Sequence, residues 1–77
     1  MDNDKLNMFV DKLRKEKKVS FILYNALYKI EYIDKRYIIN QLGVGISYIY
    51  DNITTLFDSY LVYGSTLREA FKDINIL

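Results

Sequence analysis

The chain of 77 residues contains no proline and only three glycines, at positions 43, 45 and 64. Proline and glycine most often interrupt regular structure, so long uninterrupted elements are expected between these positions. Apolar residues within those stretches recur three and four residues apart, which is the period of an amphipathic α-helix. These features predict an all-α fold, a small bundle of about five helices that forms a single domain over residues 1–77.

The expected helices follow one another with little connecting chain. The first spans 4–18 and has one apolar stripe, and the second spans 20–32 and is apolar nearly all round, which predicts that it is the most buried. A short helix at 35–42 and a longer one at 46–63 are each followed by a glycine. Glycine favours the left-handed conformation that ends a helix, so these boundaries are expected to be sharp.

Two interpretations of residues 61–77 remain open. The sequence Thr66-Leu67-Arg68-Glu69 has the pattern of a helix capping box, and apolar residues follow it at helical spacing. The alternation of Ile74-Asn75-Ile76 is instead typical of a β-hairpin. The helix accounts for more of the apolar positions, so a fifth helix is the preferred interpretation.

The chain has no cysteine and no histidine, which excludes several kinds of site. Disulfides and thiolate nucleophiles need cysteine, and an imidazole base or an ordinary transition-metal site needs histidine. A chain this short also has few residues with which to enclose a pocket, so we expect no enzyme, no cofactor and no small-molecule substrate. The acidic start MDNDK is unlike a signal peptide, and no apolar run approaches the ~20 residues of a membrane span, so a cytoplasmic protein without a membrane partner is expected.

The stretch IINQLGVGISYIYDNITTLFDSYLV (38–62) has the most distinctive pattern in the chain. Gly43, Val44 and Gly45 form an expected tight turn between two helices, because glycine accepts the positive φ that a sharp corner needs. Together with the hydrophobic segment before it, this stretch makes residues 20–62 resemble helix-turn-helix domains, in particular the MarR-like winged-helix repressors. An ordinary helical bundle with a glycine corner is the alternative interpretation of the same pattern.

The resemblance implies a helix-turn-helix at 35–62 with the wing absent or very short. It also implies a protein that binds duplex DNA as a homodimer, as a transcriptional regulator or a plasmid or viral accessory factor. The candidate base-reading residues are Ser47, Tyr48, Tyr50, Asp51, Thr54 and Thr55. The candidate phosphate contacts are Lys12, Arg14, Lys15, Lys17, Lys18, Lys35 and Arg36, since lysine and arginine supply most non-specific affinity for DNA.

The distribution of charge favours a different partner. The net charge is +1, but five cations lie within residues 12–18, whereas residues 43–64 contain two aspartates and no lysine or arginine. Exposed tyrosines are common at protein interfaces, and the second helix of the motif would present Tyr48 and Tyr50. The alternative hypothesis is therefore a non-enzymatic protein-interaction module or inhibitor that binds a protein through this tyrosine-rich segment.

Overall fold

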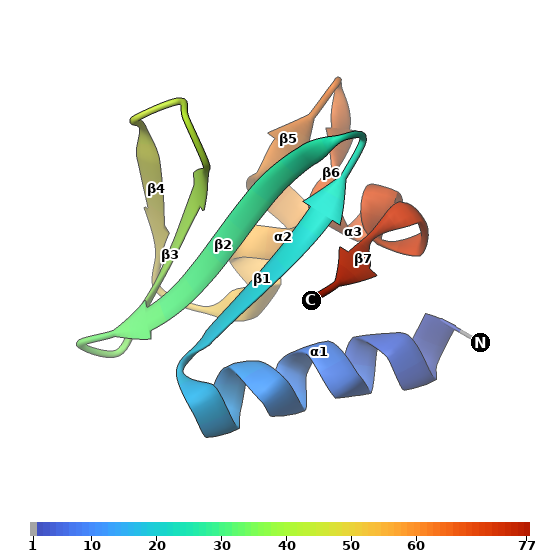
Figure 1. The fold of residues 1–77 in the computed structure, drawn as a ribbon. Helices are drawn as coiled ribbons and strands as arrows, with labels where there is room; N and C mark the ends of the chain where they lie inside the picture. The colour runs from blue at the N-terminus through green and yellow to red at the C-terminus, as the bar shows by residue number, and fades with distance from the viewer. Residues whose placement is uncertain (1) are drawn as a thin grey trace.

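The computed structural model describes residues 2–77, with side chains from Asp4 onward, and combines helices with an antiparallel sheet (Figure 1). The elements in chain order are α1 (Asp2–Glu16), β1 (Lys18–Leu23), β2 (Ala26–Ile33), β3 (Arg36–Gln41), β4 (Ser47–Tyr50), α2 (Ile53–Ser59), β5 (Leu61–Val62), β6 (Ser65–Thr66), α3 (Leu67–Ala70), the 3-10 turn η1 (Phe71–Asp73) and β7 (Asn75–Ile76). The fold is therefore mixed helix and sheet, and the predicted all-α bundle of about five helices is wrong.

The main sheet has five strands in the order β4-β3-β2-β1-β7. Strands β1 to β4 form a meander in which each strand pairs with the next, and β7 returns from the end of the chain to pair with β1 (Figure 1). Strands β5 and β6 form a separate two-stranded hairpin. In this arrangement β4 and β7 are the two edges of the main sheet.

The strands form because apolar residues alternate along them. Val19, Phe21 and Leu23 on β1 are buried, and the residues between them are exposed or half-buried. The register pairs Phe21 with Tyr28, and it carries the buried row across β2 to Ile39 on β3. Successive side chains of a strand point to opposite faces, so one face of the sheet is apolar and the other faces solvent.

Three two-residue turns reverse the chain, and the first two explain why the predicted helices at 20–32 and 35–42 are wrong. Both central residues have positive φ in each turn: Tyr24-Asn25 (50° and 64°), Asp34-Lys35 (52° and 65°) and Tyr63-Gly64 (52° and 83°). Positive φ at both positions is typical of type I′ turns, whose twist matches that of a hairpin. Only one of the three turns uses a glycine, so the chain reverses at places that its glycines do not mark.

The helix-turn-helix predicted at 35–62 is not formed. Gly43 and Gly45 have φ of +90° and +79° and do make a tight turn, but this turn joins strands β3 and β4. Of the helix predicted at 46–63, only α2 is helical. Asn52 caps α2, because its Oδ1 accepts a hydrogen bond from the Thr55 N–H at 2.7 Å.

Two local predictions are confirmed. The first helix is present as α1, and Thr66 and Glu69 form the capping box with both of its reciprocal hydrogen bonds. The helix that follows this cap is short, however, and the β5–β6 hairpin precedes it. Residues 61–77 therefore contain a hairpin, as in one interpretation, and a short helix, as in the other.

The core lies between the apolar face of the sheet and the helices. Phe9 of α1 is at its centre, with ring centroids 5.6 Å from Phe21, 5.7 Å from Phe57 and 5.4 Å from Phe71. These rings belong to β1, α2 and η1, so one aromatic cluster joins all the layers. On the other face of the sheet, Ile49 of β4 is 57% exposed.

Candidate functional site

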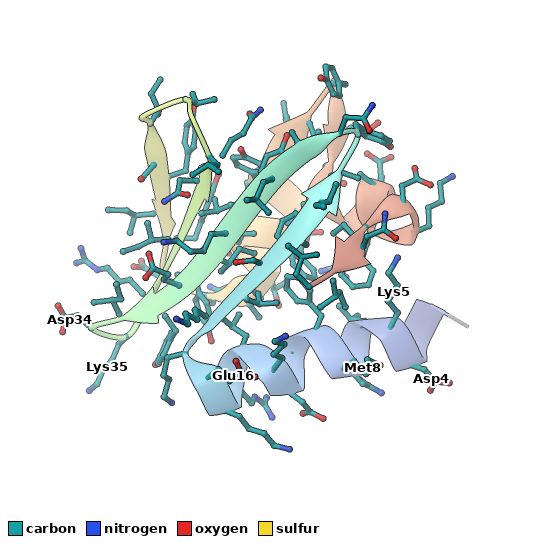
Figure 2. All side chains as sticks on the ribbon, in the orientation of Figure 1. Asp4, Lys5, Met8, Glu16, Asp34 and Lys35 are labelled. Carbon is teal, nitrogen blue, oxygen red and sulfur yellow. The ribbon has the colours of Figure 1, made fainter. Side chains whose placement is uncertain are left out.

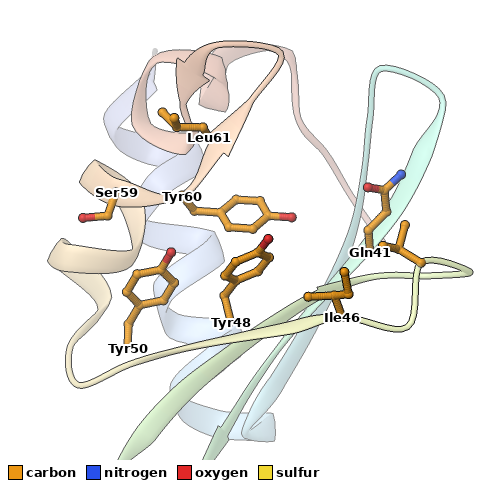
Figure 3. Close-up of a pocket in the computed structure, with 8 residues that line it drawn as sticks. Gln41, Ile46, Tyr48, Tyr50, Ser59, Tyr60 and Leu61 are labelled. Carbon is orange, nitrogen blue, oxygen red and sulfur yellow. The ribbon is translucent and has the colours of Figure 1, made fainter.

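A groove of about 400 Å³ lies between the β3–β4 hairpin and the end of α2 (Figure 3). It is termed the tyrosine groove here, and it is lined by Gln41, Val44, Ile46, Tyr48, Tyr50, Ser59, Tyr60 and Leu61. None of these residues carries a formal charge at pH 7. The groove is therefore suited to an apolar or neutral ligand, since a charged one would lose its hydration there without gaining a counter-charge.

Three tyrosines, Tyr48, Tyr50 and Tyr60, supply the aromatic rings and the hydroxyl groups of the groove. The rings of Tyr48 and Tyr60 have centroids 5.5 Å apart and are nearly perpendicular, and Tyr50 lies beside them (Figure 3). Tyr28 packs against the far side of Tyr60 with a centroid distance of 6.3 Å. Within residues 4–77, whose side chains are described, the hydroxyls of the three groove tyrosines form no hydrogen bond with another residue. These hydroxyls are available to a ligand.

Tyr50 and Tyr60 of the groove remain neutral at physiological pH. Burial, with smaller contributions from Tyr28, Tyr48 and Tyr50, raises the pKa of Tyr60 to about 12. Burial, together with the neighbouring Tyr48, also raises the pKa of Tyr50 above its usual value. A phenol with a raised pKa keeps its proton at pH 7, so these side chains act as hydrogen-bond donors and acceptors and not as bases.

Strand β4 adds a free backbone edge beside the groove. Its sequence SYIY has neither a proline nor a charged residue, which are common means of protecting an edge strand. Tyr48 and Ile49 on this strand are 50% and 57% exposed. An edge strand pairs through one side only, so part of the β4 backbone can hydrogen-bond to another extended chain.

A second hollow, of about 230 Å³, lies where α1 ends. It is termed the basic pocket here, and it is lined by Val10, Leu13, Arg14, Lys17, Tyr32, Tyr37 and Ile53. The Lys17 carbonyl accepts a hydrogen bond from the Tyr32 N–H at 2.9 Å, and the Lys17 ammonium lies 5.5 Å from the centre of the Tyr32 ring. The rings of Tyr32 and Tyr37 are 4.8 Å apart. The pocket thus combines two cations with aromatic walls.

The predicted base-reading residues do not share a helix face. Ser47, Tyr48 and Tyr50 are on β4, Asp51 follows that strand, and Thr54 and Thr55 are in the first turn of α2. The carboxylate of Asp51 lies 3.9 Å from the guanidinium of Arg36, which was a predicted phosphate contact. Two of the six residues, Tyr48 and Tyr50, line the tyrosine groove.

The predicted phosphate contacts divide among different parts of the molecule. Lys12 and Lys18 line one hollow together with Glu16, and the Lys12 ammonium donates to the main-chain oxygen of Leu77. Lys35 lies in the turn between β2 and β3, where Figure 2 labels it. Only Arg14 and Lys17 of this set line the basic pocket.

Sequence reasoning missed several lining residues of both hollows. In the groove these are Gln41, Ile46, Ser59, Tyr60 and Leu61, and in the pocket they are Tyr32, Tyr37 and Ile53 among others. One signal was present: Leu42, Val44, Ile46 and Tyr48 are apolar at every second position, which is typical of an extended chain. The glycines between them also fit a helical corner, and that prediction is wrong because they join β3 and β4.

Two further properties bear on what the chain can bind. Among the side chains that the structure describes, those of residues 4–77, no group of three or more acidic residues is placed to hold a metal ion. Among the described residues, no helix has the length and apolar character that a membrane span requires.

In comparisons with known proteins, no family model, no curated protein and no solved structure matches this chain.

Proposed function

We propose that the chain is a non-enzymatic protein-binding domain that holds an extended, uncharged segment of a partner protein along β4 and in the tyrosine groove. The observation that carries this proposal is the gathering of exposed apolar side chains around one uncharged hollow. Leu42, Val44, Ile46, Tyr48 and Leu61 are between 50% and 71% exposed. Apolar patches of this kind mark interaction sites, because water solvates them poorly.

The geometry suggests how such a segment would bind. Its backbone would pair with the free edge of β4, which is the common mode of peptide binding at a sheet edge. Every second side chain of the segment would then point to the face on which Tyr48 and Tyr50 lie, since side chains alternate along a strand. Apolar side chains would pack against Val44, Ile46 and Leu61, and the tyrosine hydroxyls would donate to carbonyls of the segment.

Duplex-DNA binding stays a prediction, and the long helix at 46–63 that was expected to contact the bases is not present. The segment 43–64 forms a strand, a loop, a seven-residue helix and half of a small hairpin, and it has no lysine or arginine to contact phosphate. The homodimer that the resemblance implied is also a prediction. A second copy pairing along β4 is one outcome that the experiments below distinguish.

Selection from a library of random twelve-residue peptides tests the proposal. Enriched peptides are expected to be uncharged and to alternate apolar with other residues. Tyr48→Lys places a charge in the groove and is expected to weaken their binding at least tenfold. Ile33→Lys is the matched control, because Ile33 is also apolar and 46% exposed but lies at the other end of the sheet. Failure to enrich any peptide over the Tyr48→Lys variant would overturn the proposal.

Amide hydrogen exchange tests the strand pairing itself. Binding is expected to slow the exchange of amides in Ser47–Tyr50, because those that face outward gain a hydrogen-bond partner. A bound peptide that leaves these amides unprotected would exclude pairing along β4. Sedimentation equilibrium completes the test: a wild-type dimer that Tyr48→Lys converts to a monomer would make a second copy the occupant and contradict the partner-protein proposal.

A further inference from the structure

We infer that the basic pocket is a second, separate binding site, which takes a small ligand that joins one anionic group to one planar apolar ring. Its volume of about 230 Å³ sets the size of the ligand. Pockets that bury drug-sized molecules measure roughly 300–1,000 Å³, so this one accommodates little more than a single ring and its substituent. Neither the size nor the charge of the pocket fits the extended neutral segment proposed for the tyrosine groove.

The two cations of the pocket are free to meet an anion. Arg14 and Lys17 are three residues apart at the end of α1, and both line the hollow. The ion pairs within the described residues join Lys29 to Glu31, Arg36 to Asp51 and Arg68 to Asp58. Arg14 and Lys17 therefore have no carboxylate partner among the side chains of residues 4–77, and both are exposed to solvent.

The backbone at Lys17 has a left-handed conformation that ends α1. Lys17 directly follows α1 with φ of 63°, in the left-handed region where glycine is favoured. The hydrogen bond between its carbonyl and the Tyr32 N–H holds this conformation. In this position the ammonium lies over the Tyr32 ring, at the rim of the pocket. The conformation is that of a common helix ending, in which the Lys17 N–H donates to the Leu13 carbonyl, and it leaves the cation beside the hollow.

The walls of the pocket suit a flat apolar body. Tyr32 and Tyr37 meet at an interplanar angle of 43°, and Ile53 from α2 closes the hollow with Val10 and Leu13 of α1. A planar ring would pack against these surfaces while its anionic group reaches Arg14 and Lys17. Aromatic walls bind such rings well, and charge-assisted hydrogen bonds to guanidinium and ammonium groups hold the anion.

The surrounding charges also favour an anion. The negative end of the α1 dipole, equivalent to about half a charge, opposes anion binding at this place. Glu16 adds one negative charge, and Asp34 lies in the nearby turn. Four cations at positions 14, 15, 17 and 18 outweigh the dipole and Glu16, and Lys35 offsets Asp34 in the same turn. The net local charge is positive.

Titration of ¹⁵N-labelled protein, followed by NMR, tests this inference with four probes. Benzoate and phenyl phosphate are expected to shift the amides of residues 14–17, 32 and 37 and to saturate. Inorganic phosphate, which has no ring, and benzyl alcohol, which has no charge, are each expected to bind at least tenfold more weakly. A preference between benzoate and phenyl phosphate identifies the natural anion as a carboxylate or a phosphate.

Matched variants separate a built pocket from a general positive field. Arg14→Gln and Lys17→Gln are expected to weaken benzoate binding at least tenfold. Lys15→Gln and Lys18→Gln remove the same charge from the same run, but neither residue lines the pocket, so binding should change less than twofold. All four residues are exposed, so the variants should fold, and circular dichroism checks this.

Three results would overturn the inference. The first is a loss in Lys15→Gln as large as that in Lys17→Gln, which would mean that only the general field attracts the anion. The second is equal binding of benzyl alcohol and benzoate. The third is loss of benzoate binding in Tyr48→Lys, which would place the ligand in the tyrosine groove. Because the peptide experiments use the groove and these use the pocket, either proposal can fail alone.

Discussion

The tyrosine groove and the basic pocket are both lined by tyrosines, yet they offer different chemistry. The groove lies beside a free strand edge and has no charged lining residue. The pocket lies against α1 and has Arg14 and Lys17 at its rim. Tyrosine supplies apolar area and a hydroxyl in both places, so the neighbouring residues decide which ligand each hollow accepts.

The same two elements contribute to both hollows. Strand β3 provides Tyr37 to the pocket near its start and Gln41 to the groove at its end. Helix α2 likewise provides Ile53 to the pocket and Ser59 to the groove. A change in the middle of α2 should therefore affect both sites, whereas a change at one rim should affect one.

The largest effect is expected for Leu56→Ala. Leu56 is fully buried in the middle of α2, and truncating such a leucine costs about 2–5 kcal/mol of unfolding free energy. This is a large share of the roughly 5–15 kcal/mol that stabilises a typical domain, so peptide and benzoate binding should weaken together. Urea unfolding followed by circular dichroism measures the loss.

Leu61→Ala is the control for that prediction. Leu61 is 61% exposed and lines the groove, so its truncation should change stability by no more than ~0.5 kcal/mol while weakening peptide binding alone. If Leu56→Ala left benzoate binding intact and abolished only peptide binding, the two hollows would not depend on one core.

The next largest effects are expected at the helix caps. Asn52→Ala removes the acceptor of the 2.7 Å hydrogen bond that begins α2, which should cost about 1 kcal/mol. Thr66→Ala removes the corresponding cap of α3 at a similar cost, about 1 kcal/mol, but α3 lines neither hollow. Because Ile53 is in the first turn of α2, only Asn52→Ala should weaken benzoate binding in the NMR titration. Equal weakening in both variants would mean that global stability, and not the position of Ile53, controls the pocket.

The sequence predicted the elements that depend on neighbours along the chain. Helix α1 follows from its apolar stripe, and the cap of α3 follows from Thr66 and Glu69 being three residues apart. The strands were mistaken for helices because Leu23, Leu27 and Ile30 also fit a helical spacing. The turn at Tyr24-Asn25 separates the first of these residues from the other two, and its positive φ values carry no glycine signal.

The two hollows were predicted only in part, for a related reason. Tyr48 and Tyr50 were selected as exposed side chains, and Arg14 and Lys17 as members of a basic run. Their partners are distant in sequence: Tyr60 contacts Tyr48 only after the chain has passed through α2, and Tyr32 reaches Lys17 through the β1–β2 hairpin. Such contacts depend on strand register, which local apolar spacing does not determine when turn positions are misassigned.

A smaller effect of opposite sign is expected for Lys17→Gly. An L-residue in the left-handed region costs about 1–2 kcal/mol, whereas glycine loses roughly 0.5–1 kcal/mol through its more flexible unfolded state. The variant also loses the exposed contact between Lys17 and Tyr32, worth about 0.5 kcal/mol, so a small net gain of about 0.25 kcal/mol is expected. Benzoate binding should fall at the same time and peptide binding should not. A variant less stable than the wild type by more than about 1 kcal/mol would show that the backbone at Lys17 is not strained.

The smallest effect on stability at neutral pH is expected at Tyr60. Here a rise in pH, which ionises the tyrosine side chain, changes the groove. An unfolded tyrosine titrates near ~10, whereas the pKa of folded Tyr60 is about 12. The contribution of Tyr60 to stability is therefore fully present below pH ~10 and declines as the pH rises through about 12, because the unfolded chain releases this proton first. Tyr60→Phe cannot ionise, so the difference in urea midpoint between wild type and variant should be constant up to pH ~10 and should then shift against the wild type. Subtracting the variant's midpoint from that of the wild type cancels the titration of the lysines and the other tyrosines. A difference that stays constant up to pH 12 would therefore mean that Tyr60 is solvated like an unfolded tyrosine. The groove would then be open to water at its base.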